Sequence, residues 1–255
     1  MNGSDLPPAA QKAAYVNRMF AQIAHSYDLT NRLITAGQDI AWRRKVIELC
    51  RLPAAGRFLD VGTGTGDIAF EARRLHPNAE VIGCDFTYEM MAVGRKKSER
   101  ASWRDLSAGT DGVEFVQGDG MRLPFAGGRF DAVASGFLLR NVTDVDLCLA
   151  EQRRVTKSGG RMVCLETSPP PQSALTPLLR FYLFKVIPLL GRLITSAGGA
   201  ANRSPDSNPY QYLSASTAAF LPPQEMGRRM AQAGFRHVSY LPRMFGTVAI
   251  YVGIA

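Results

Sequence analysis

The chain has 255 residues, 46% of them hydrophobic and 20% charged, which fits one globular α/β domain and excludes a largely disordered protein. Its 30 lysines and arginines against 22 aspartates and glutamates give a formal net charge of +8, which favours contact with phosphate on nucleic acid or on an anionic membrane surface without choosing between them. No charged and then apolar leader opens the chain, and its 4 cysteines and 3 histidines are scattered, so we expect a cytoplasmic protein with reduced cysteines and no metal site.

Residues 12–53 are predicted to form an N-terminal helical cap. Apolar side chains recur there at the spacing of a helix, as at Val16, Phe20 and Ile23, and the whole stretch suits two or three helices. Residues 54–56 (Ala-Ala-Gly) break this pattern, so we expect the cap to end there.

Residues 54–168 are predicted to form a cofactor-binding core in which strands alternate with helices. The expected strands are the short apolar runs 57–61, 80–84, 113–117, 130–135 and 160–166. The expected helices between them are 68–75, 88–100 and 145–155. Because strands that alternate with helices form parallel βαβ units, the fold class is α/β with a doubly wound sheet.

The alternation stops at three consecutive prolines, residues 169–171. We treat residues 169–223 as an insertion that faces the substrate or a membrane. Residues 224–255 are expected to rejoin the core as a helix at 224–233 followed by strands at 237–241 and 247–253. All four segments are treated as parts of one domain.

A glycine loop joins the first strand to the helix that follows it. Gly62, Gly64 and Gly66 let the backbone turn sharply and approach a ligand closely. Their G-x-G-x-G spacing differs from the G-x-G-x-x-G pattern of a pyrophosphate site. Asp60 and Asp67 flank the loop, which suits a ligand that carries an amino group and a sulfonium. A plain tight turn between strand and helix is the alternative.

Two further aspartates follow the next two predicted strands. Asp85 falls 19 positions after Gly66, where a carboxylate accepts the hydroxyls of a ribose. Asp119 follows the third strand and is suited to accept a hydrogen bond from an adenine amino group. Each alone could be a strand-end aspartate that faces solvent. Because ligands of open α/β sheets bind outside the carboxyl ends of the strands, the combination predicts an adenosine-containing cofactor.

The run Leu59 to Asp67, with Asp85, Asp119 and residues 130–133, resembles the class I S-adenosylmethionine-dependent methyltransferases. The resemblance implies a Rossmann-like, seven-stranded, mostly parallel sheet with an antiparallel last strand, and S-adenosylmethionine as cofactor. The positions that it assigns to cofactor binding are Asp60, Gly62, Gly64, Thr65, Gly66, Asp85, Phe86, Asp119, Gly120 and Gly136.

Motifs outside the cofactor site are similar to those of the UbiE/MenG family of quinone C-methyltransferases. These motifs are residues 20–31, Trp42-Arg43, 85–90, 139–144, 154–168, 210–213 with Ser216, and 246–253. The resemblance covers nearly the whole chain from about Tyr15 onward. It implies C-methylation of a polyprenyl quinol ring in menaquinone or ubiquinone biosynthesis, with demethylmenaquinol as the favoured acceptor.

The chain departs from the family pattern at several positions. The family usually has Met, Ser and His where this chain has Thr30, Thr35 and Asp39. It has a glycine where this chain has Leu138, and a serine of its cofactor site falls at Gly136. These departures leave the cofactor motifs in place and concern the identity of the acceptor.

The resemblance assigns the chemistry to four residues. Methylation of a quinol ring carbon needs a deprotonated ring hydroxyl, correct alignment and exclusion of water. Arg140 is expected to stabilise the phenolate, directly or through water, and Asn141 lies beside it in the same motif. In the cap, Asp28 is the expected base and Tyr27 its hydrogen-bonding partner. The alternatives are a surface ion pair for Arg140 and a packing role for Tyr27.

Residues 175–194 combine apolar side chains with the basic residues Arg180, Lys185 and Arg192. The charges and prolines prevent this segment from spanning a bilayer, but it suits an anionic membrane surface. A polyprenyl quinol resides in the bilayer, so such a face would let its tail pass into the site. The alternatives are a buried helix pair at the sheet edge and a homodimer contact. We expect a cytoplasmic protein, which the first of these interpretations would place peripherally on the inner face of the cell membrane.

Three other functions remain as alternatives. The basic pI suggests an RNA methyltransferase, but the chain has no RNA-binding module and no Asn-Pro-Pro-Tyr type of motif after the fourth strand, so nucleic acid is not an expected partner. Another small lipophilic acceptor would suit the same core. A non-catalytic cofactor-binding module is disfavoured by the intact Asp60, Asp85 and Asp119.

Overall fold

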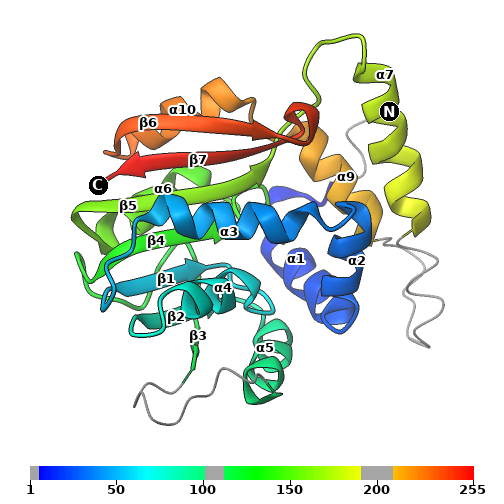
Figure 1. The fold of residues 1–255 in the computed structure, drawn as a ribbon. Helices are drawn as coiled ribbons and strands as arrows, with labels where there is room; N and C mark the ends of the chain where they lie inside the picture. The colour runs from blue at the N-terminus through cyan, green and yellow to red at the C-terminus, as the bar shows by residue number, and fades with distance from the viewer. Residues whose placement is uncertain (1–5, 101–111, 191–208) are drawn as a thin grey trace.

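A seven-stranded sheet runs through the centre of the structure (Figure 1), a computed structural model that describes residues 6–100, 112–190 and 209–255. The strand order is β3-β2-β1-β4-β5-β7-β6. The strands are β1 (Arg57–Val61), β2 (Glu80–Asp85), β3 (Glu114–Gln117), β4 (Phe130–Gly136), β5 (Thr156–Thr167), β6 (Arg236–Arg243) and β7 (Val248–Ile254). Strands β1 to β5 pair in parallel, and β7 runs antiparallel to β5 and β6. The predicted sheet with a reversed last strand is therefore confirmed.

Helices cover both faces of the sheet and gather beyond the carboxyl ends of its parallel strands (Figure 1). They are α1 (Ala9–Ile23), α2 (Tyr27–Ile34), α3 (Gln38–Cys50), α4 (Asp67–Leu75), α5 (Tyr88–Arg100), α6 (Val145–Val155), α7 (Thr176–Phe181), the π-helical turn η3 (Tyr182–Val186), α9 (Pro209–Ala219), α10 (Pro223–Gln232) and the short 3-10 turn η4 (Met244–Gly246). The predicted cap contains three helices, which is the upper of the two expected numbers.

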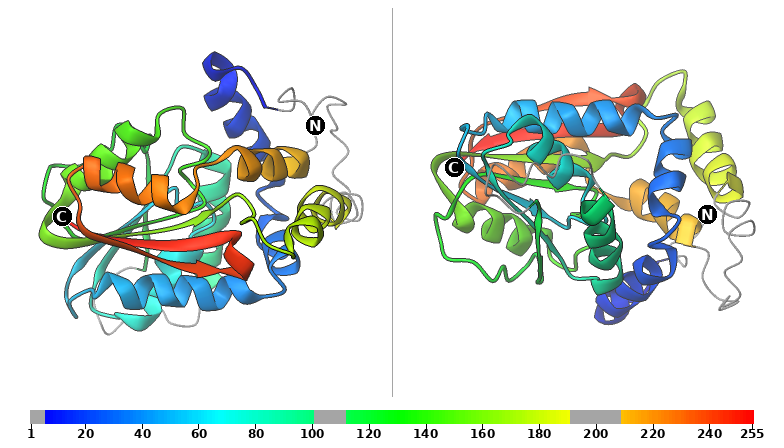
Figure 2. Two further views of the ribbon diagram at one scale, coloured as in Figure 1. Left: turned by 90° about the horizontal axis from the view of Figure 1, so that it is seen from above. Right: turned by 60° about the horizontal axis from the view of Figure 1, so that its bottom comes forward.

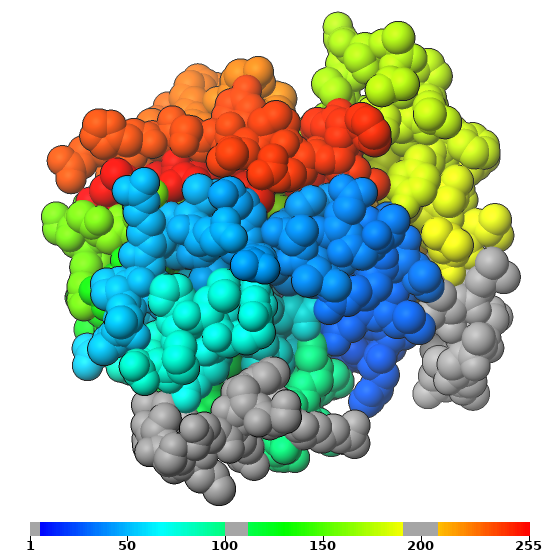
Figure 3. Space-filling model, viewed as in Figure 1, coloured from blue at the N-terminus to red at the C-terminus, as the bar shows by residue number. Residues whose placement is uncertain are grey.

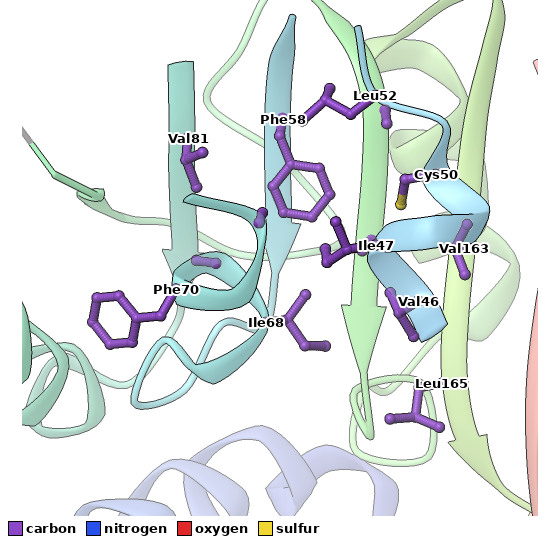
Figure 4. Packing of buried hydrophobic residues seen from close by; sticks show 14 of the residues in the cluster. Val46, Ile47, Cys50, Leu52, Phe58, Ile68, Phe70, Val81, Val163 and Leu165 are labelled. Carbon is purple, nitrogen blue, oxygen red and sulfur yellow. The ribbon is translucent and has the colours of Figure 1, made fainter. Parts of the chain in front are cut away.

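Helix α3 packs on one face of the sheet, whereas α6 and α10 pack on the other (Figure 2). Ile47 of α3 and Phe58 of β1 have no exposed surface and belong to one apolar cluster (Figure 4). Burial of one side chain of this size contributes about 1.5–3 kcal/mol. The last helix of the predicted cap is thus part of the packed core. Of the three cap helices, only α1 and α2 lie beyond the strand ends.

Strand β5 begins earlier than the sequence pattern indicates. It starts at Thr156 instead of Gly160, because Thr156 already pairs with Phe130 of β4. The ladder then shifts register, and Ala132 pairs with Arg161. A polar stretch between these two pairs hides the early start from an apolar pattern.

The insertion packs against the cap through hydrogen bonds. The Tyr182 hydroxyl donates to the carbonyl of Ile34 at the end of α2. The Tyr210 hydroxyl of α9 lies 3.1 Å from the Thr30 hydroxyl of α2, within hydrogen-bond distance. Figure 3 shows the insertion, in yellow-green, directly beside the blue cap. Arg192, the last basic residue of the segment that we expect to face a membrane, lies outside the described residues.

The insertion does not contain a membrane span among the described residues. Searched over the described parts of the chain, no helix is both long and apolar enough to cross a bilayer.

Candidate functional site

A first cavity of about 810 Å³ opens where the parallel strands end. Its wall includes most of the residues that the sequence assigns to cofactor binding. Those in the wall are Gly62, Gly64, Asp85, Phe86, Asp119, Gly120 and Gly136. The strand order explains why they meet: β1, β2, β3 and β4 are neighbours, so the loops that follow them share one edge of the sheet.

The glycine loop is fastened to the end of β2 by Asp85. Gly62 and Gly64 adopt φ angles of +69° and +56°, which favour glycine. A Cβ atom at Gly62 would lie 2.8 Å from Leu138, so the loop has no room for a side chain there. The Gly64 N–H donates to Asp85 Oδ2 at 2.7 Å, and the Thr87 N–H donates to Asp85 Oδ1 at 2.8 Å. The Phe86 N–H is a third backbone donor to this carboxylate, which leaves it one acceptor position for a ligand hydroxyl.

A third, smaller cavity of about 370 Å³ continues along the loop past Asp60 and Thr65. Asp60 Oδ2 accepts hydrogen bonds from Thr63 Oγ1 at 2.8 Å and from the Ala69 N–H at 3.2 Å. Its Oδ1 atom is buried and has no partner among the described residues. Burial raises the pKa of Asp60 to about 7, against the effect of those two hydrogen bonds. A nearby cationic ligand would stabilise the charged carboxylate.

Asp28 is turned away from these cavities. Its Oδ1 atom accepts from the Thr65 hydroxyl at 2.5 Å, and its Oδ2 atom from Lys97 Nζ at 2.7 Å. Lys97 also pairs with Asp67, at 2.5 Å. This group of charges ties α2 to the glycine loop and to α5. Asp28 lines none of the three cavities, so the structure does not bring the expected base to the acceptor space.

A second cavity of about 730 Å³ lies between the cap, the insertion and β7. Apolar residues from these parts, from the loop after β4 and from η4 make up about half of the residues that line it, and most of its surface is apolar. They are Ile34, Trp42, Phe137, Leu183, Ile187, Leu213, Met244 and Val248. Tyr27 and Phe137 line all three cavities, so these two residues mark the junction where contents of the cavities would meet.

Arg140 enters the wall of the second cavity and is held by Glu166 of β5. Arg140 Nη1 lies 2.6 Å from Glu166 Oε1 and donates to the Phe137 carbonyl at 3.2 Å. Its Nε atom has no partner among the described residues. Glu166 is fully buried, and a buried carboxylate of this kind needs its cation. Sequence reasoning missed this role, although a glutamate within an apolar strand is a signal of a buried partner.

Asn141 lines the first cavity beside the junction, and Tyr27 forms part of the junction itself. Asn141 donates from Nδ2 to the Phe137 carbonyl at 2.8 Å and accepts from the Tyr212 hydroxyl at 3.2 Å. Tyr27 packs edge-on against Phe20, with ring centroids 5.8 Å apart. Burial raises the pKa of the Tyr27 hydroxyl, so this group remains protonated at neutral pH and acts as a donor. Gly66, the remaining predicted position, directly precedes α4 with a φ of +89° and lines none of the three cavities.

The sequence pattern of the ubiE/COQ5 methyltransferase family matches residues 9–255. The chain belongs to this family. It is 41% identical to a demethylmenaquinone methyltransferase of Roseiflexus castenholzii, over 100% of this chain and 99% of that protein. It is also 41% identical to a ubiquinone/menaquinone biosynthesis C-methyltransferase, UbiE, of Desulfotalea psychrophila, over 95% of this chain and 91% of that protein.

Solved structures share the fold of this ubiE/COQ5 family member. A methyltransferase from Thermotoga maritima that depends on S-adenosylmethionine superposes with a TM-score of 0.61 at 19% identity, covering 94% of this chain and 99% of that one. A phosphoethanolamine N-methyltransferase from Haemonchus contortus, solved with S-adenosylmethionine, gives a TM-score of 0.54 at 16% identity, covering 82% and 42%. The class I methyltransferase fold is therefore confirmed, and S-adenosylmethionine is the cofactor of this family member.

The described residues fit this cofactor. Asp85 and Asp119 line the first cavity, where their carboxylate oxygens would accept hydrogen bonds from the ribose and the adenine. The unpartnered Oδ1 of Asp60 would face the cationic methionine part in the third cavity. The cofactor supplies a methyl group on a positively charged sulfur. The junction at Tyr27 and Phe137 is where an acceptor in the second cavity would receive it.

Proposed function

We propose that this chain methylates a ring carbon of a polyprenyl quinol and that demethylmenaquinol is its first acceptor. The observation that carries the proposal is the second cavity, which is largely apolar, meets the cofactor cavities at Tyr27 and Phe137, and contains the buried cation Arg140. An apolar ring fits such a space, and a cation would stabilise the negative charge on the ring oxygen of a phenolate. The name of the relative from Roseiflexus castenholzii supports the naphthoquinol acceptor.

The roles of the residues follow from their positions. The guanidinium of Arg140 would stabilise the phenolate form of the acceptor, which makes the neighbouring ring carbon nucleophilic. Glu166 keeps Arg140 in place, at 2.6 Å. The Tyr27 hydroxyl would donate to the acceptor or to a water at the junction. Phe137 and the cap would exclude bulk water from the reacting groups.

The direct test is an assay of the purified protein with S-adenosylmethionine and chemically reduced, short-tailed demethylmenaquinol. We expect a product that carries one additional methyl group on the naphthoquinol ring, as detected by mass spectrometry. A methoxy-polyprenyl-benzoquinol in a parallel reaction distinguishes the two acceptor classes. Methylation of neither quinol would refute the proposal.

We also propose that the outer side of the insertion contacts an anionic membrane. Leu178, Phe181 and Leu189 are exposed by 64%, 59% and 57%, and Arg180 and Lys185 are exposed between them. The opposite side of the same segment contributes Leu183 and Ile187 to the second cavity. One segment thus joins the exposed apolar surface to the acceptor space, which suits a substrate that enters from the bilayer.

Exchange of two exposed apolar residues for serine tests this membrane contact. The double variant Leu178→Ser with Phe181→Ser is expected to lose most of its retention on vesicles that contain anionic lipid. The matched control is Leu147→Ser, because Leu147 is 48% exposed but belongs to α6 in the core of the fold. Sedimentation with vesicles at low salt is the measurement. Equal retention of the double variant and the control would contradict the proposal, and conversion of a dimer to a monomer would assign the surface to a homodimer contact instead.

A further inference from the structure

A buried carboxylate in the second cavity has no part in the reaction described above. Asp39 of α3 is 1% exposed and lines this cavity together with Thr35. Among the described residues that line it, Asp39 carries the only negative charge and Arg140 the only positive charge. Burying a charge in a largely apolar cavity costs free energy, so a carboxylate at this position is expected to have a function.

The two oxygens of Asp39 differ in their surroundings. Oδ2 pairs with the guanidinium of Arg43 and, at 3.3 Å, with that of Arg32. Oδ1 accepts from the Thr35 hydroxyl, at 3.0 Å. A carboxylate oxygen accepts two hydrogen bonds. Oδ1 can therefore accept one more hydrogen bond. Because Asp39 lines the second cavity, a molecule bound there could donate it.

The anchoring of Arg43 alone does not explain Asp39. Arg43 Nη1 also lies 2.9 Å from Asp67 Oδ2, at the start of α4. Arg43 thus keeps a carboxylate partner even without Asp39. Asp39 instead depends on Arg43 and Arg32, which compensate its charge in the wall of the cavity.

We infer that Asp39 accepts a hydrogen bond from a ring hydroxyl of the reduced acceptor and thereby excludes the oxidised quinone from the second cavity. A quinol carries hydroxyl donors, whereas a quinone presents only carbonyl acceptors. A carbonyl oxygen that faces the carboxylate would gain no hydrogen bond and would be repelled by it. The inference rests on the proposed quinol acceptor and adds a selection of redox state to it.

This selection has a chemical purpose. The quinone ring is not nucleophilic and cannot accept a methyl cation equivalent. Bound in the second cavity, it would only block the site. A carboxylate that accepts a hydrogen bond from a ring hydroxyl and repels a ring carbonyl therefore keeps the site free for the quinol when both redox forms are present.

The test compares inhibition by oxidised, short-tailed demethylmenaquinone in the wild type and in Asp39→Asn. An amide can rotate to donate to a carbonyl, so D39N should be inhibited about tenfold or more strongly than the wild type. The KM for the quinol should rise in the same variant. Two controls keep a carboxylate at this place: Asp39→Glu, and Arg32→Gln, which removes only the outer partner. Both should retain weak inhibition by the quinone.

Affinity for S-adenosylmethionine, measured by calorimetry, shows whether each variant is folded. A folded D39N with wild-type inhibition would overturn the inference. The wild type gives an independent measurement if D39N does not fold: it should bind the quinol at least about tenfold more tightly than the quinone, and equal affinities would overturn the inference as well. If the wild type methylates no quinol at all, the proposed function fails instead.

Discussion

Exchange of Arg140 for glutamine is expected to lower kcat by about 100- to 1,000-fold, the range found when one preorganised donor to a developing oxyanion is removed. Among the described residues that line the second cavity, no other cation is present to stabilise a phenolate. The affinity for S-adenosylmethionine should stay close to that of the wild type, because Arg140 does not line the first or the third cavity. Single-turnover kinetics and calorimetry measure the two quantities.

Glu166 requires a control in this experiment. Removal of Arg140 alone leaves a fully buried carboxylate without its partner, and such a loss costs about 3–5 kcal/mol of stability. The double variant Arg140→Gln with Glu166→Gln replaces the ion pair by two neutral amides of similar size. It should be more stable than Arg140→Gln in thermal unfolding and equally slow in turnover. A double variant with a normal rate would remove Arg140 from the mechanism.

Exchange of Asp85 for alanine is expected to raise the Kd for S-adenosylmethionine by about 100-fold. The carboxylate would hold the ribose and also accepts from the N–H groups of Gly64 and Thr87. Each hydrogen bond to a charged group contributes about 1.5–3 kcal/mol, and a buried donor left without a partner adds a penalty. At saturating cofactor the rate should recover to within a few-fold, because Asp85 does not line the second cavity.

A matched control for this variant is Asp146→Ala. Asp146 is a largely exposed residue of α6 whose carboxylate pairs with Arg229 at the surface. Its loss should leave the cofactor affinity unchanged. Isothermal titration calorimetry of both variants is the measurement. An unchanged Kd in Asp85→Ala would refute the placement of the ribose at the end of β2.

Much of the fold was predictable because it depends on local patterns. Apolar runs such as 57–61 and 130–135 report burial on both faces of a parallel sheet, which needs no knowledge of distant partners. The early start of β5 was not predictable, because Thr156 pairs with Phe130 through backbone atoms that leave no trace in side-chain polarity.

The candidate site also contains residues that the sequence pattern places correctly and residues whose position depends on tertiary packing. Residues that follow neighbouring strands, such as Gly62, Asp85 and Asp119, meet because the sheet topology brings them together. Tyr27 and Asp28 are adjacent in sequence, yet one lines three cavities and the other pairs with Lys97. Successive side chains of a helix point about 100° apart, and only tertiary packing decides which of them faces the site.

The wall of the second cavity was the least predictable part. Its residues come from α2, α3, the loop after β4, the end of β5, the insertion with its helix α9, and the stretch from η4 to the start of β7. No pattern within one segment indicates that these parts converge. In the sequence, Asp39 and Thr35 differ from the family pattern but carry no sign of a shared cavity, because their joint place in it depends on the path of the chain between α2 and α3.

The junction has a consequence for how such proteins diversify. The cofactor cavities are built mainly from loops of the core, whereas the acceptor cavity is built mainly from the cap, the insertion and the C-terminal strand pair. Tyr27 and Phe137 are the residues that line both kinds of cavity. Substitutions elsewhere in the acceptor wall can therefore accumulate without disturbing methyl-donor binding. Over evolutionary time, or in a directed-evolution library, new ring substrates should be gained there while these two positions stay fixed.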